Sequence, residues 1–372
     1  MGAGVKRRIV LSGVNLFEGG PLSVYYDALS ALSENFSKDY EVIALVHSKD
    51  LFDIHNVRFI EYPEVRGSWI HRLYFEYSVL RKLSRELDAY LWVSLHDITP
   101  PVNATIQAVY CHNPSPFFVL RWRDVIYDSR HAAFVLFYRF LYRINIHRNT
   151  YVIVQQQWLR HMFRKLYHLD NVIVAHPVAD TSPTPPIESD KVMGRHSARF
   201  TFFFPAYPRV FKNAEVLLEA ARLLEAHPIE LWLTFSKSDG RYARSLVRRY
   251  GKLPNVQFLG RLTRAQVFER YKAADCLVFP SLLETWGLPI SEFKATGKPM
   301  LLADLPYAHE TVGTYQNVAF FDPYSSQELS ILMKTLSSGE LHFSGSEEQA
   351  IRPPFAANWH DLFELLLGSA SQ

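Results

Sequence analysis

Short apolar runs alternate with longer amphipathic segments along this chain, and the series occurs twice, once on each side of a proline-rich stretch. A short run that is apolar throughout is typical of a strand buried on both faces of a sheet. An amphipathic segment between two such runs is typical of the crossover helix of a βαβ unit. The pattern therefore predicts an α/β protein with two doubly wound, parallel-stranded domains, whose ligands bind at the carboxyl ends of the strands.

The predicted elements fall into two groups. The first has strands at 8–12, 41–46, 89–94, 105–111 and 151–154, and helices at 22–34, 69–86 and 131–146. The second has strands at 200–204, 230–235, 256–259 and 276–279, and helices at 214–225, 243–250 and 264–273. The domains are then 1–178 and 199–352, joined by a linker at 179–198, with a C-terminal helix in 353–372 that can pack back on the first domain.

Composition narrows the class of protein. A chain of 372 residues is too long for one ordinary core, and 48% hydrophobic residues are enough for two. The net charge of +3 is small for a protein that coats nucleic acid, and two distant cysteines form no disulfide framework. No apolar run approaches the roughly 20 residues of a membrane span, and the run after Lys6-Arg7-Arg8 is too short for a signal peptide. We therefore expect a cytoplasmic protein.

The stretch PSLLETWGLPISEFKATGKPML places one glutamate on each side of a helix entrance. Glu284 lies in the loop after the strand at 276–279, and Glu292 lies in the helix, for which Pro289 is a favourable first residue. Backbone N–H groups near Gly287 are then free to meet an anion, as in a phosphate flanked by hydroxyl-binding carboxylates. On spacing alone an ordinary interpretation is favoured, in which Glu292 stabilises the positive helix end and Glu284 is a solvated loop residue.

The same block, ETWGLPISE followed by ATGKP, resembles the E-x7-E signature of the retaining glycosyltransferases of the GT4 family. The resemblance continues in FLGRLTRAQVFERYKAADCLVFPS before it and in ADLPYAHETVG and NVAFFDPYSSQEL after it, so it covers most of the second domain. In the first domain it is limited to Gly19-Gly20 and VYCHNPSPF. The family has the GT-B fold, two Rossmann-like domains that face each other across a cleft. The resemblance implies that the second domain binds a nucleotide-sugar and the first an acceptor.

The resemblance also implies individual roles. Glu284 contacts the transferred sugar, and Glu292 binds the ribose hydroxyls. The loops 236–241 and 260–262 flank the base. The other residues expected to bind the donor are Thr285, Gly287, Leu288, Pro289, Gly19, Gly20 and Gly260.

Two cations follow the strand at 200–204. Arg209 and Lys212 lie in the loop before the next helix, where fixed positive charge stabilises a departing diphosphate. The alternative is that both are solvated, since a helix start disfavours cations. In the GT4 family an Arg and a Lys in the corresponding loop bind the donor diphosphate. Their usual spacing is wider than here, so Lys212 is the firmer assignment.

Metal and dinucleotide motifs are missing from the sequence. No two aspartates lie two positions apart, so there is no D-x-D motif of metal-dependent glycosyltransferases, and there is no G-x-G-x-x-G motif. We therefore expect metal-independent transfer without a cofactor, with a nucleotide-diphosphate sugar as substrate.

Two features of the first domain are candidates for contact with the substrates. Gly19-Gly20 lies between a strand and a helix expected to begin near Leu22, where it is either a tight turn or a close approach to phosphate. His112 ends a strand and is either structural or, by resemblance, a sugar-orienting group. His96 and Asp97, at another strand end, are a lower-ranked alternative.

Residues 121–167 are rich in arginine and aromatic side chains. Within them, HAAFVLFYRFLYRINIHR is either a helix at an anionic membrane surface or a buried helix whose arginines reach solvent. Nucleic acid fits less well, because the aromatic residues share the apolar face.

We therefore predict a retaining glycosyltransferase that moves a hexose or deoxyhexose from a UDP- or GDP-linked donor to a saccharide or lipid-linked saccharide, in the synthesis of O-antigen, capsule or exopolysaccharide. Contact with the inner face of the plasma membrane is part of this expectation. A nucleotide-sugar epimerase on the same fold and a non-catalytic sugar-nucleotide-binding protein are the alternatives. Trp286 stands where the family usually has Phe. The sequence does not specify the nucleotide base, the sugar, the acceptor or the linkage.

Overall fold

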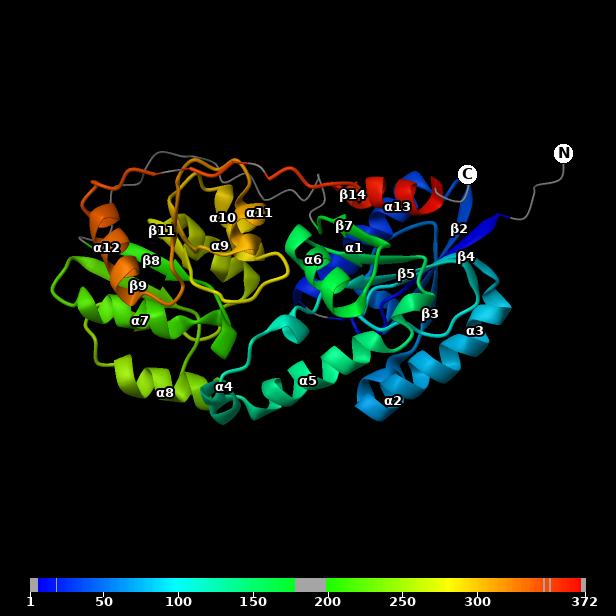
Figure 1. Ribbon diagram of the computed structural model, residues 1–372, viewed down its shortest axis with the longest axis horizontal. Coiled ribbons are helices and arrows are strands. Elements are labelled where there is room, and N and C mark those ends of the chain that lie inside the picture. The colour runs from blue at the N-terminus through cyan, green and yellow to red at the C-terminus, as the bar shows by residue number, and fades with distance from the viewer. Residues whose placement is uncertain (1–5, 18, 178–198, 344, 348, 369–372) are drawn as a thin grey trace. The chain divides into compact units, whose positions relative to one another are not determined.

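The computed structural model describes residues 6–17, 19–177, 199–343, 345–347 and 349–368 (Figure 1). The chain divides into two compact units. The first comprises residues 1–117, 136–182 and 351–372, and the second comprises residues 118–135 and 183–350. The predicted linker, 179–198, lies outside the described residues.

The segment 118–135 differs from its predicted place. The sequence predicts that it belongs to the first domain, whereas it groups with the second unit. Aromatic contacts account for this, since the ring of Phe118 packs on Phe211 and the ring of Tyr127 packs on Tyr242.

The first unit is built on an eight-stranded, fully parallel sheet with the order β14-β7-β6-β5-β4-β1-β2-β3. Its central strands are buried almost throughout, as expected when helices cover both faces. The strands are β1 (Arg7–Ser12), β2 (Tyr40–Val46), β3 (Val57–Glu61), β4 (Ala89–Ser94), β5 (Ala104–Cys111), β6 (Tyr151–Val154), β7 (Val172–Ala175) and β14 (Phe355–Ala356).

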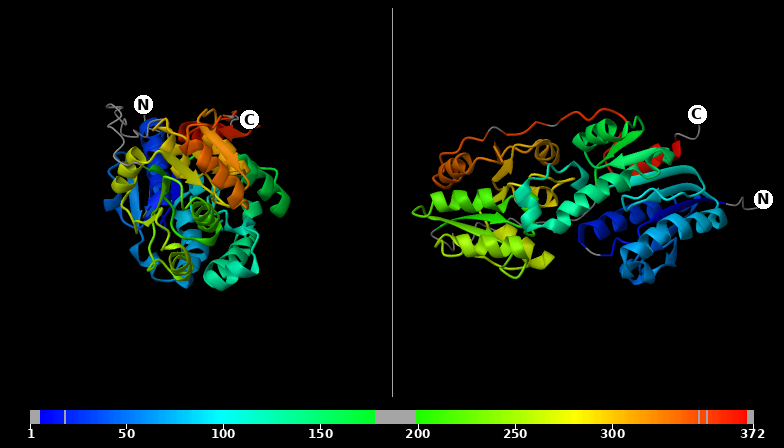
Figure 2. Two further views of the ribbon diagram at one scale, coloured as in Figure 1. Left: turned by 90° about the vertical axis from the view of Figure 1, so that its left-hand side faces the viewer. Right: turned by 60° about the horizontal axis from the view of Figure 1, so that its bottom comes forward.

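The helices of this unit lie on both sides of its sheet (Figure 2). The sequence predicts one helix at 69–86, and the structure instead has two helices joined by a π-helical turn, Phe75–Val79. The helices are α1 (Gly19–Asn35), α2 (Trp69–Tyr74), α3 (Leu80–Leu87), α5 (Ser129–Arg143, which continues from the second unit), α6 (Gln157–Tyr167) and α13 (Trp359–Gly368).

The C-terminal segment is part of the first unit's core. Strand β14 pairs with β7, and helix α13 packs against α1. Trp359 and Phe363 are buried in the same apolar cluster as Leu29 and Leu32 of α1. The last described residues therefore complete the fold of the first ones, far away in sequence (Figure 1).

The second unit has a six-stranded parallel sheet with the order β10-β9-β8-β11-β12-β13. Its strands are β8 (Phe200–Phe204), β9 (Ile229–Leu233), β10 (Val256–Phe258), β11 (Cys276–Phe279), β12 (Met300–Ala303) and β13 (Val318–Phe321). Its helices are α4 (Trp122–Tyr127), α7 (Ala214–Leu223), α8 (Arg241–Tyr250), α9 (Arg264–Ala273), α10 (Leu288–Lys294), α11 (Pro306–Val312) and α12 (Ser326–Ser337).

Each sheet has one point where the strand order reverses. In the first unit β1 lies between β4 and β2, and in the second unit β8 lies between β11 and β9. Chain connections leave such a switch point in opposite directions, which opens a crevice at the carboxyl ends of the two central strands. The predicted class, two doubly wound parallel α/β domains, is confirmed. The expected cleft between the domains stays a prediction.

Candidate functional site

The loops at the second unit's switch point are hydrogen-bonded to each other. Strand β8 is followed by 205–213, and β11 is followed by 280–287. The N–H of Leu282 donates to the carbonyl of Phe211 at 2.7 Å, and the Asn213 amide donates to the carbonyl of Pro280 at 3.2 Å. Asn213 adopts a left-handed conformation (φ 56°) at the cap of α7, which turns the chain sharply after Lys212. The two loops are therefore held together as one continuous surface at the carboxyl ends of β8 and β11.

Lys212 and Glu284 meet on this surface. The Lys212 ammonium donates to Glu284 Oε1, although the residues are 72 positions apart. The two side chains are only 19% and 13% exposed, and the ammonium lies 5.5 Å from the centre of the Phe279 ring. A pair with so little solvent around it is screened less than a surface pair. The structure thus brings together two of the predicted residues.

Arg209 is placed differently from Lys212. Its guanidinium pairs with Asp128 at 2.7 Å and lies 5.5 Å from the centre of the Tyr207 ring. Asp128 comes from the segment that the sequence assigned to the first domain, so this partner was not predicted. The Arg209 side chain is 46% exposed, and it can therefore exchange its carboxylate partner for another anion at small cost.

The helix entrance before Glu292 depends on a glycine. Gly287 has φ 87°, and a Cβ there would lie 3.2 Å from the Ile290 side chain. Helix α10 starts at Leu288, so Pro289 is its second residue and not its first as predicted. Thr285 lies in the loop just before this turn.

Glu292 is a partly buried carboxylate with two partners that the sequence did not reveal. The Tyr271 hydroxyl donates to its Oε2 at 3.0 Å, and the Arg264 guanidinium lies 3.5 Å from its Oε1. Burial raises the pKa of Glu292, while Tyr271 and Arg264 act in the opposite direction. Both partners come from α9. An ordinary amphipathic helix also contains aromatic residues and arginines, so the hydrophobic periodicity of the sequence does not distinguish these two as partners of Glu292.

The loops predicted to flank a base are also joined. Arg261 pairs with Asp239 at 2.6 Å, and its guanidinium lies 4.9 Å from the centre of the Tyr207 ring. Gly260 has φ 75° with open space where a side chain would be. These contacts connect 236–241 with 260–262, next to the loop after β8.

In the first unit, His112 follows β5 and is partly buried. Its Nε2 lies 3.6 Å from Asp97 Oδ2, while Asp97 Oδ1 accepts the His112 backbone N–H at 2.8 Å and the Tyr142 hydroxyl at 2.8 Å. Gly19 and Gly20 are already in helix α1, which begins three residues before its predicted start at Leu22. Pro21 is accepted there because the first helical turn does not use its N–H groups.

The lower-ranked candidate, His96, does not reach the surface. Its side chain is 1% exposed, and its neighbour Asp97 is used in holding the loop of His112. Burial lowers the pKa of His96 well below its ordinary value, with Arg72 acting in the same direction. The structure therefore favours His112 over His96 as a ligand-contacting group.

The segment 121–167 presents apolar side chains to solvent in the first unit. On α5, Leu136 is 63% and Phe140 is 64% exposed, and the Phe137 ring contacts Trp69 of α2. Arg139 donates to the carbonyl of Pro116. The side chains of Arg123 and Arg130, also in this segment, lie outside the described residues.

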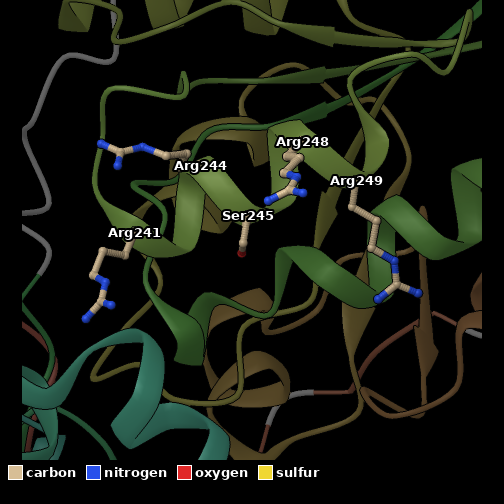
Figure 3. Close-up of a pocket in the computed structure, with 5 residues that line it drawn as sticks. All are labelled: Arg241, Arg244, Ser245, Arg248 and Arg249. Atoms are coloured by element: carbon tan, nitrogen blue, oxygen red, sulfur yellow. The ribbon is translucent and has the colours of Figure 1, made fainter.

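A separate hollow lies along α8 in the second unit. It is lined by Arg241, Arg244, Ser245, Arg248 and Arg249 (Figure 3), of which Arg241 ends the loop 236–241 that was predicted to flank the base. Within the described ranges, no group of three or more His, Cys, Asp or Glu side chains is arranged to hold a metal ion. Nor does any described helix have the length and apolar character needed to cross a bilayer.

Comparison with known families gives a match in the second unit. Residues 189–351 match the sequence model of the family "Glycosyl transferases group 1". The match is thus to a group 1 glycosyltransferase domain, and it covers less than half of the chain.

The chain matches curated proteins over part of their length. It is 29% identical over 151 residues to a D-inositol 3-phosphate glycosyltransferase of Corynebacterium aurimucosum, covering 36% of this chain and 35% of that protein. It is 30% identical over 95 residues to an uncharacterized glycosyltransferase of Methanocaldococcus jannaschii, covering 25% of this chain and 24% of that protein. The matches therefore span roughly a quarter to a third of these relatives.

Solved structures resemble the whole fold. A glycosyltransferase from Rickettsia africae ESF-5 superimposes with a TM-score of 0.63 at 13% identity, covering 90% of this chain and 89% of that one. The lipopolysaccharide outer core galactosyltransferase WaaB gives 0.60 at 15% identity over 98% and 99% of the chains. Anabaena HepE in complex with UDP gives 0.57 at 18% identity over 88% and 89%. At these identities the likeness concerns the fold, the GT-B class.

Proposed function

We propose that the protein is a metal-independent retaining glycosyltransferase that moves a hexose or deoxyhexose from a UDP- or GDP-linked donor to a saccharide or lipid-linked saccharide. The observation that carries this proposal is the contact between Lys212 and Glu284 at the switch point of a group 1 glycosyltransferase domain. The complexes of HepE with UDP and with UDP-glucose support a nucleotide-sugar donor.

The donor would lie across the two loops after β8 and β11. In this arrangement Lys212 binds the diphosphate, and Arg209 joins it by leaving Asp128. Glu284 accepts hydrogen bonds from hydroxyls of the transferred sugar. Glu292, held by Tyr271, accepts the ribose hydroxyls.

The chemistry follows from where charge develops. The bond from the sugar C1 to the departing phosphate oxygen breaks, and a bond from C1 to the acceptor oxygen forms on the same face of the sugar. The acceptor proton passes to the departing phosphate oxygen. Negative charge grows on the diphosphate as its bond to C1 breaks, so the cation of Lys212 stabilises the transition state more than the ground state. Exclusion of water favours transfer over hydrolysis.

The acceptor side of the proposal rests on the first unit. His112 orients the sugar, and Gly19 and Gly20 allow close approach of the chain to the substrates. The exposed apolar side chains of α5 and α2, which include Ile70 at 78% exposure, would contact the inner face of an anionic plasma membrane together with the exposed Arg143, and a lipid-linked acceptor is found there. The likeness to WaaB supports a place in cell-surface polysaccharide synthesis, such as that of O-antigen, capsule or exopolysaccharide.

The direct test is turnover of a donor panel. UDP-glucose, UDP-galactose and GDP-mannose would each be incubated with the protein in EDTA, with and without a mixture of simple saccharides, and followed by proton NMR. We expect one donor to yield nucleoside diphosphate and a sugar or glycoside whose anomeric configuration is retained. An inverted product would contradict the retaining mechanism, and turnover only after addition of Mg²⁺ would contradict metal independence.

Two variants make this test specific. Lys212→Ala should abolish most turnover, whereas Lys272→Ala, which removes an exposed lysine of α9, should leave it unchanged. A free nucleotide together with an epimerised sugar would identify an epimerase. Nucleotide binding without turnover of any donor would identify a binding protein.

A further inference from the structure

Three buried polar side chains from three different elements meet at the first unit's switch point. Ser12 ends β1, His96 follows β4, and Glu76 lies in the π-helical turn between α2 and α3. Their residues are 0%, 1% and 0% exposed. His96 Nε2 lies 3.2 Å from Ser12 Oγ, and His96 Nδ1 lies 3.2 Å from Glu76 Oε1. One imidazole therefore faces a hydroxyl with one nitrogen and a carboxyl group with the other.

Glu76 is an unusual residue at such a depth. Neither of its carboxyl oxygens has a hydrogen-bond partner among the described residues, because the contact with Nδ1 has hydrogen-bonding distance without the matching orientation. Rotation about the last side-chain bond, whose torsion is broad in glutamate, aligns the two groups. A buried carboxyl group without a partner is unfavourable, so this alignment satisfies both groups. π-helical turns are also rare and are often found at functional sites.

The surroundings keep both groups neutral near pH 7. Burial raises the pKa of Glu76 to about 8, although the nearby Arg72 acts in the opposite direction. Burial lowers the pKa of His96 well below its ordinary value, and Arg72 and His112 add to this effect. Arg72 also donates to the His96 carbonyl at 3.1 Å. Tyr77, next to Glu76, carries a hydroxyl whose pKa burial raises to about 12, so it does not titrate in this range.

We propose that Glu76, His96 and Ser12 form a proton-coupled chain that sets the hydrogen-bond role of the Ser12 hydroxyl. In the protonated form, the Glu76 O–H donates to Nδ1 and the Nε2–H donates to Ser12 Oγ. After one proton leaves to solvent, the carboxylate accepts from Nδ1–H, and Nε2 accepts from the Ser12 O–H. The imidazole stays neutral and changes tautomer, so Ser12 changes from acceptor to donor.

The proton-coupled chain formed by Glu76, His96 and Ser12 acts on the loop that leads to α1. Ser12 is the last residue of β1, and the N–H of the following Gly13 is bonded to the carbonyl of Leu45 at 3.1 Å. The next helix starts with Gly19 and Gly20. This inference rests on the proposed function, in which Gly19 and Gly20 approach the substrates. Glu76 is then a positioning residue for the loop that leads to these glycines. It acts through His96 and touches no substrate.

The first test reads the tautomer directly. Protein with ¹⁵N-labelled histidine would be followed by NMR from pH 6.5 to 9.5, with His96→Gln used to assign the signals. We expect the Nε2–H tautomer at low pH and the Nδ1–H tautomer at high pH. In Glu76→Gln the tautomer should be the same across the whole range, whereas Glu86→Gln, an exposed neighbour on α3, should behave as the wild type. A wild-type tautomer that does not change with pH, or one that changes equally in Glu76→Gln, would overturn the proposal.

The second test separates positioning from folding and from the proposed function. In the transferase assay, kcat of the wild type should change at least about threefold across the same pH range, and Glu76→Gln and Ser12→Ala should lose this dependence. Nucleotide affinity of the second unit should be unchanged in both variants. A tautomer change with no transfer activity at all would contradict the proposed function but not the proton-coupled chain. A kcat change that persists in Ser12→Ala would overturn the role given to Ser12.

Discussion

At the scale of single residues, Lys212 is the side chain on which the proposed function depends most. Replacement by Ala removes the cation that would face the departing diphosphate and leaves the Glu284 carboxylate partly buried without it. Loss of one group that stabilises developing charge typically lowers kcat by about 10²–10³-fold. We expect a loss of this size for Lys212→Ala in steady-state kinetics with the preferred donor.

A double variant distinguishes catalysis from simple pairing. If Lys212 serves only to neutralise Glu284, then Lys212→Ala with Glu284→Gln should recover the activity lost in Lys212→Ala alone. Under the present account the double variant recovers thermal stability at most, and its kcat stays low. Recovered turnover would therefore argue against a role in transfer.

Glu292 predicts a pH dependence of donor binding. Burial raises its pKa, so the carboxylate takes up a proton at a higher pH than an exposed glutamate does. Since ionised carboxylates accept hydroxyl hydrogen bonds more strongly, nucleotide affinity should fall as pH drops from 7 to 5. Calorimetric titration of UDP-glucose or GDP-mannose, whose diphosphates do not titrate in this range, should show this fall in the wild type and a weaker, flat affinity in Glu292→Gln. Glu269→Gln, on the exposed side of α9, is the matched control, and an equally flat wild-type profile would contradict the prediction.

Glu76 predicts a pH dependence of stability. Its pKa is near 4.5 in the unfolded chain and about 8 in the folded one, so between these values the folded state holds one more proton. Stability contributed by this group is fully present below pH 4.5 and is lost as pH rises towards 8. At about 1.4 kcal/mol per pKa unit, the loss is on the order of a few kcal/mol. Relative to Glu76→Gln, the wild type should therefore unfold at lower urea as pH rises from 5 to 8, and parallel curves would contradict this.

The places of several candidate residues in the fold were predictable from the sequence. Glu284 and Lys212 lie in loops after strands, and Glu292 lies in the helix that follows Gly287, as the sequence predicts. Their partners were not predictable in this way. Asp128 reaches Arg209 across 81 positions, and Tyr271 has the periodicity of an ordinary core residue. Nothing in the sequence indicated that Glu76 is buried, because a glutamate in a predicted amphipathic helix is ordinarily expected on the solvated face.

At the scale of elements, short central strands were predicted with accurate bounds, since β4, β6, β8 and β11 are continuous apolar runs. The elements that were missed are strands β3, β7, β12, β13 and β14 and helices α4, α6, α11 and α12. Strand β3 alternates with polar residues at the sheet edge, and β7 is only four residues long. Helix starts were less accurate, as at Gly19, because glycine and proline in the first turn suggest a loop until the hydrogen bonds are seen.

The C-terminal helix α13 predicts a stability effect on the first unit. Phe363 is fully buried against residues of α1, so Phe363→Ala should cost about 3–5 kcal/mol. The neighbouring Glu364 is exposed, and Glu364→Ala should be near neutral. Urea unfolding of both variants would measure the difference. Equal stability of the two variants would show that α13 is not part of this core.

Helices α2 and α5 predict binding to lipid. The double variant Leu136→Ser with Phe140→Ser should reduce co-flotation with anionic vesicles at least several-fold, because it removes apolar area and leaves the charge unchanged. Ile331→Ser, an equally exposed apolar residue on α12, is the control. Equal binding to neutral and anionic vesicles, or no effect of the double variant, would contradict membrane contact through this face.

At the scale of the whole molecule, the same architectural rule applies to both halves. Each sheet reverses its strand order once, and the residues of interest gather at that point. Ser12 and His96 lie at the first reversal, and Lys212 and Glu284 lie at the second. Residues 189–351 match a glycosyltransferase family at the level of sequence, whereas the likeness to known structures covers 90% of the chain and concerns the fold. Sequence therefore indicates more about the donor side than about the acceptor side.

The most direct measurement is thermal unfolding of the full chain with saturating UDP or GDP, with and without EDTA. A ligand at about 100 times its Kd stabilises the folded state by about 2.7 kcal/mol. We expect that one nucleotide raises the unfolding temperature of the wild type, that EDTA does not change this shift, and that Lys212→Ala reduces it. If neither nucleotide shifts the transition, the donor site assigned to the second unit is contradicted.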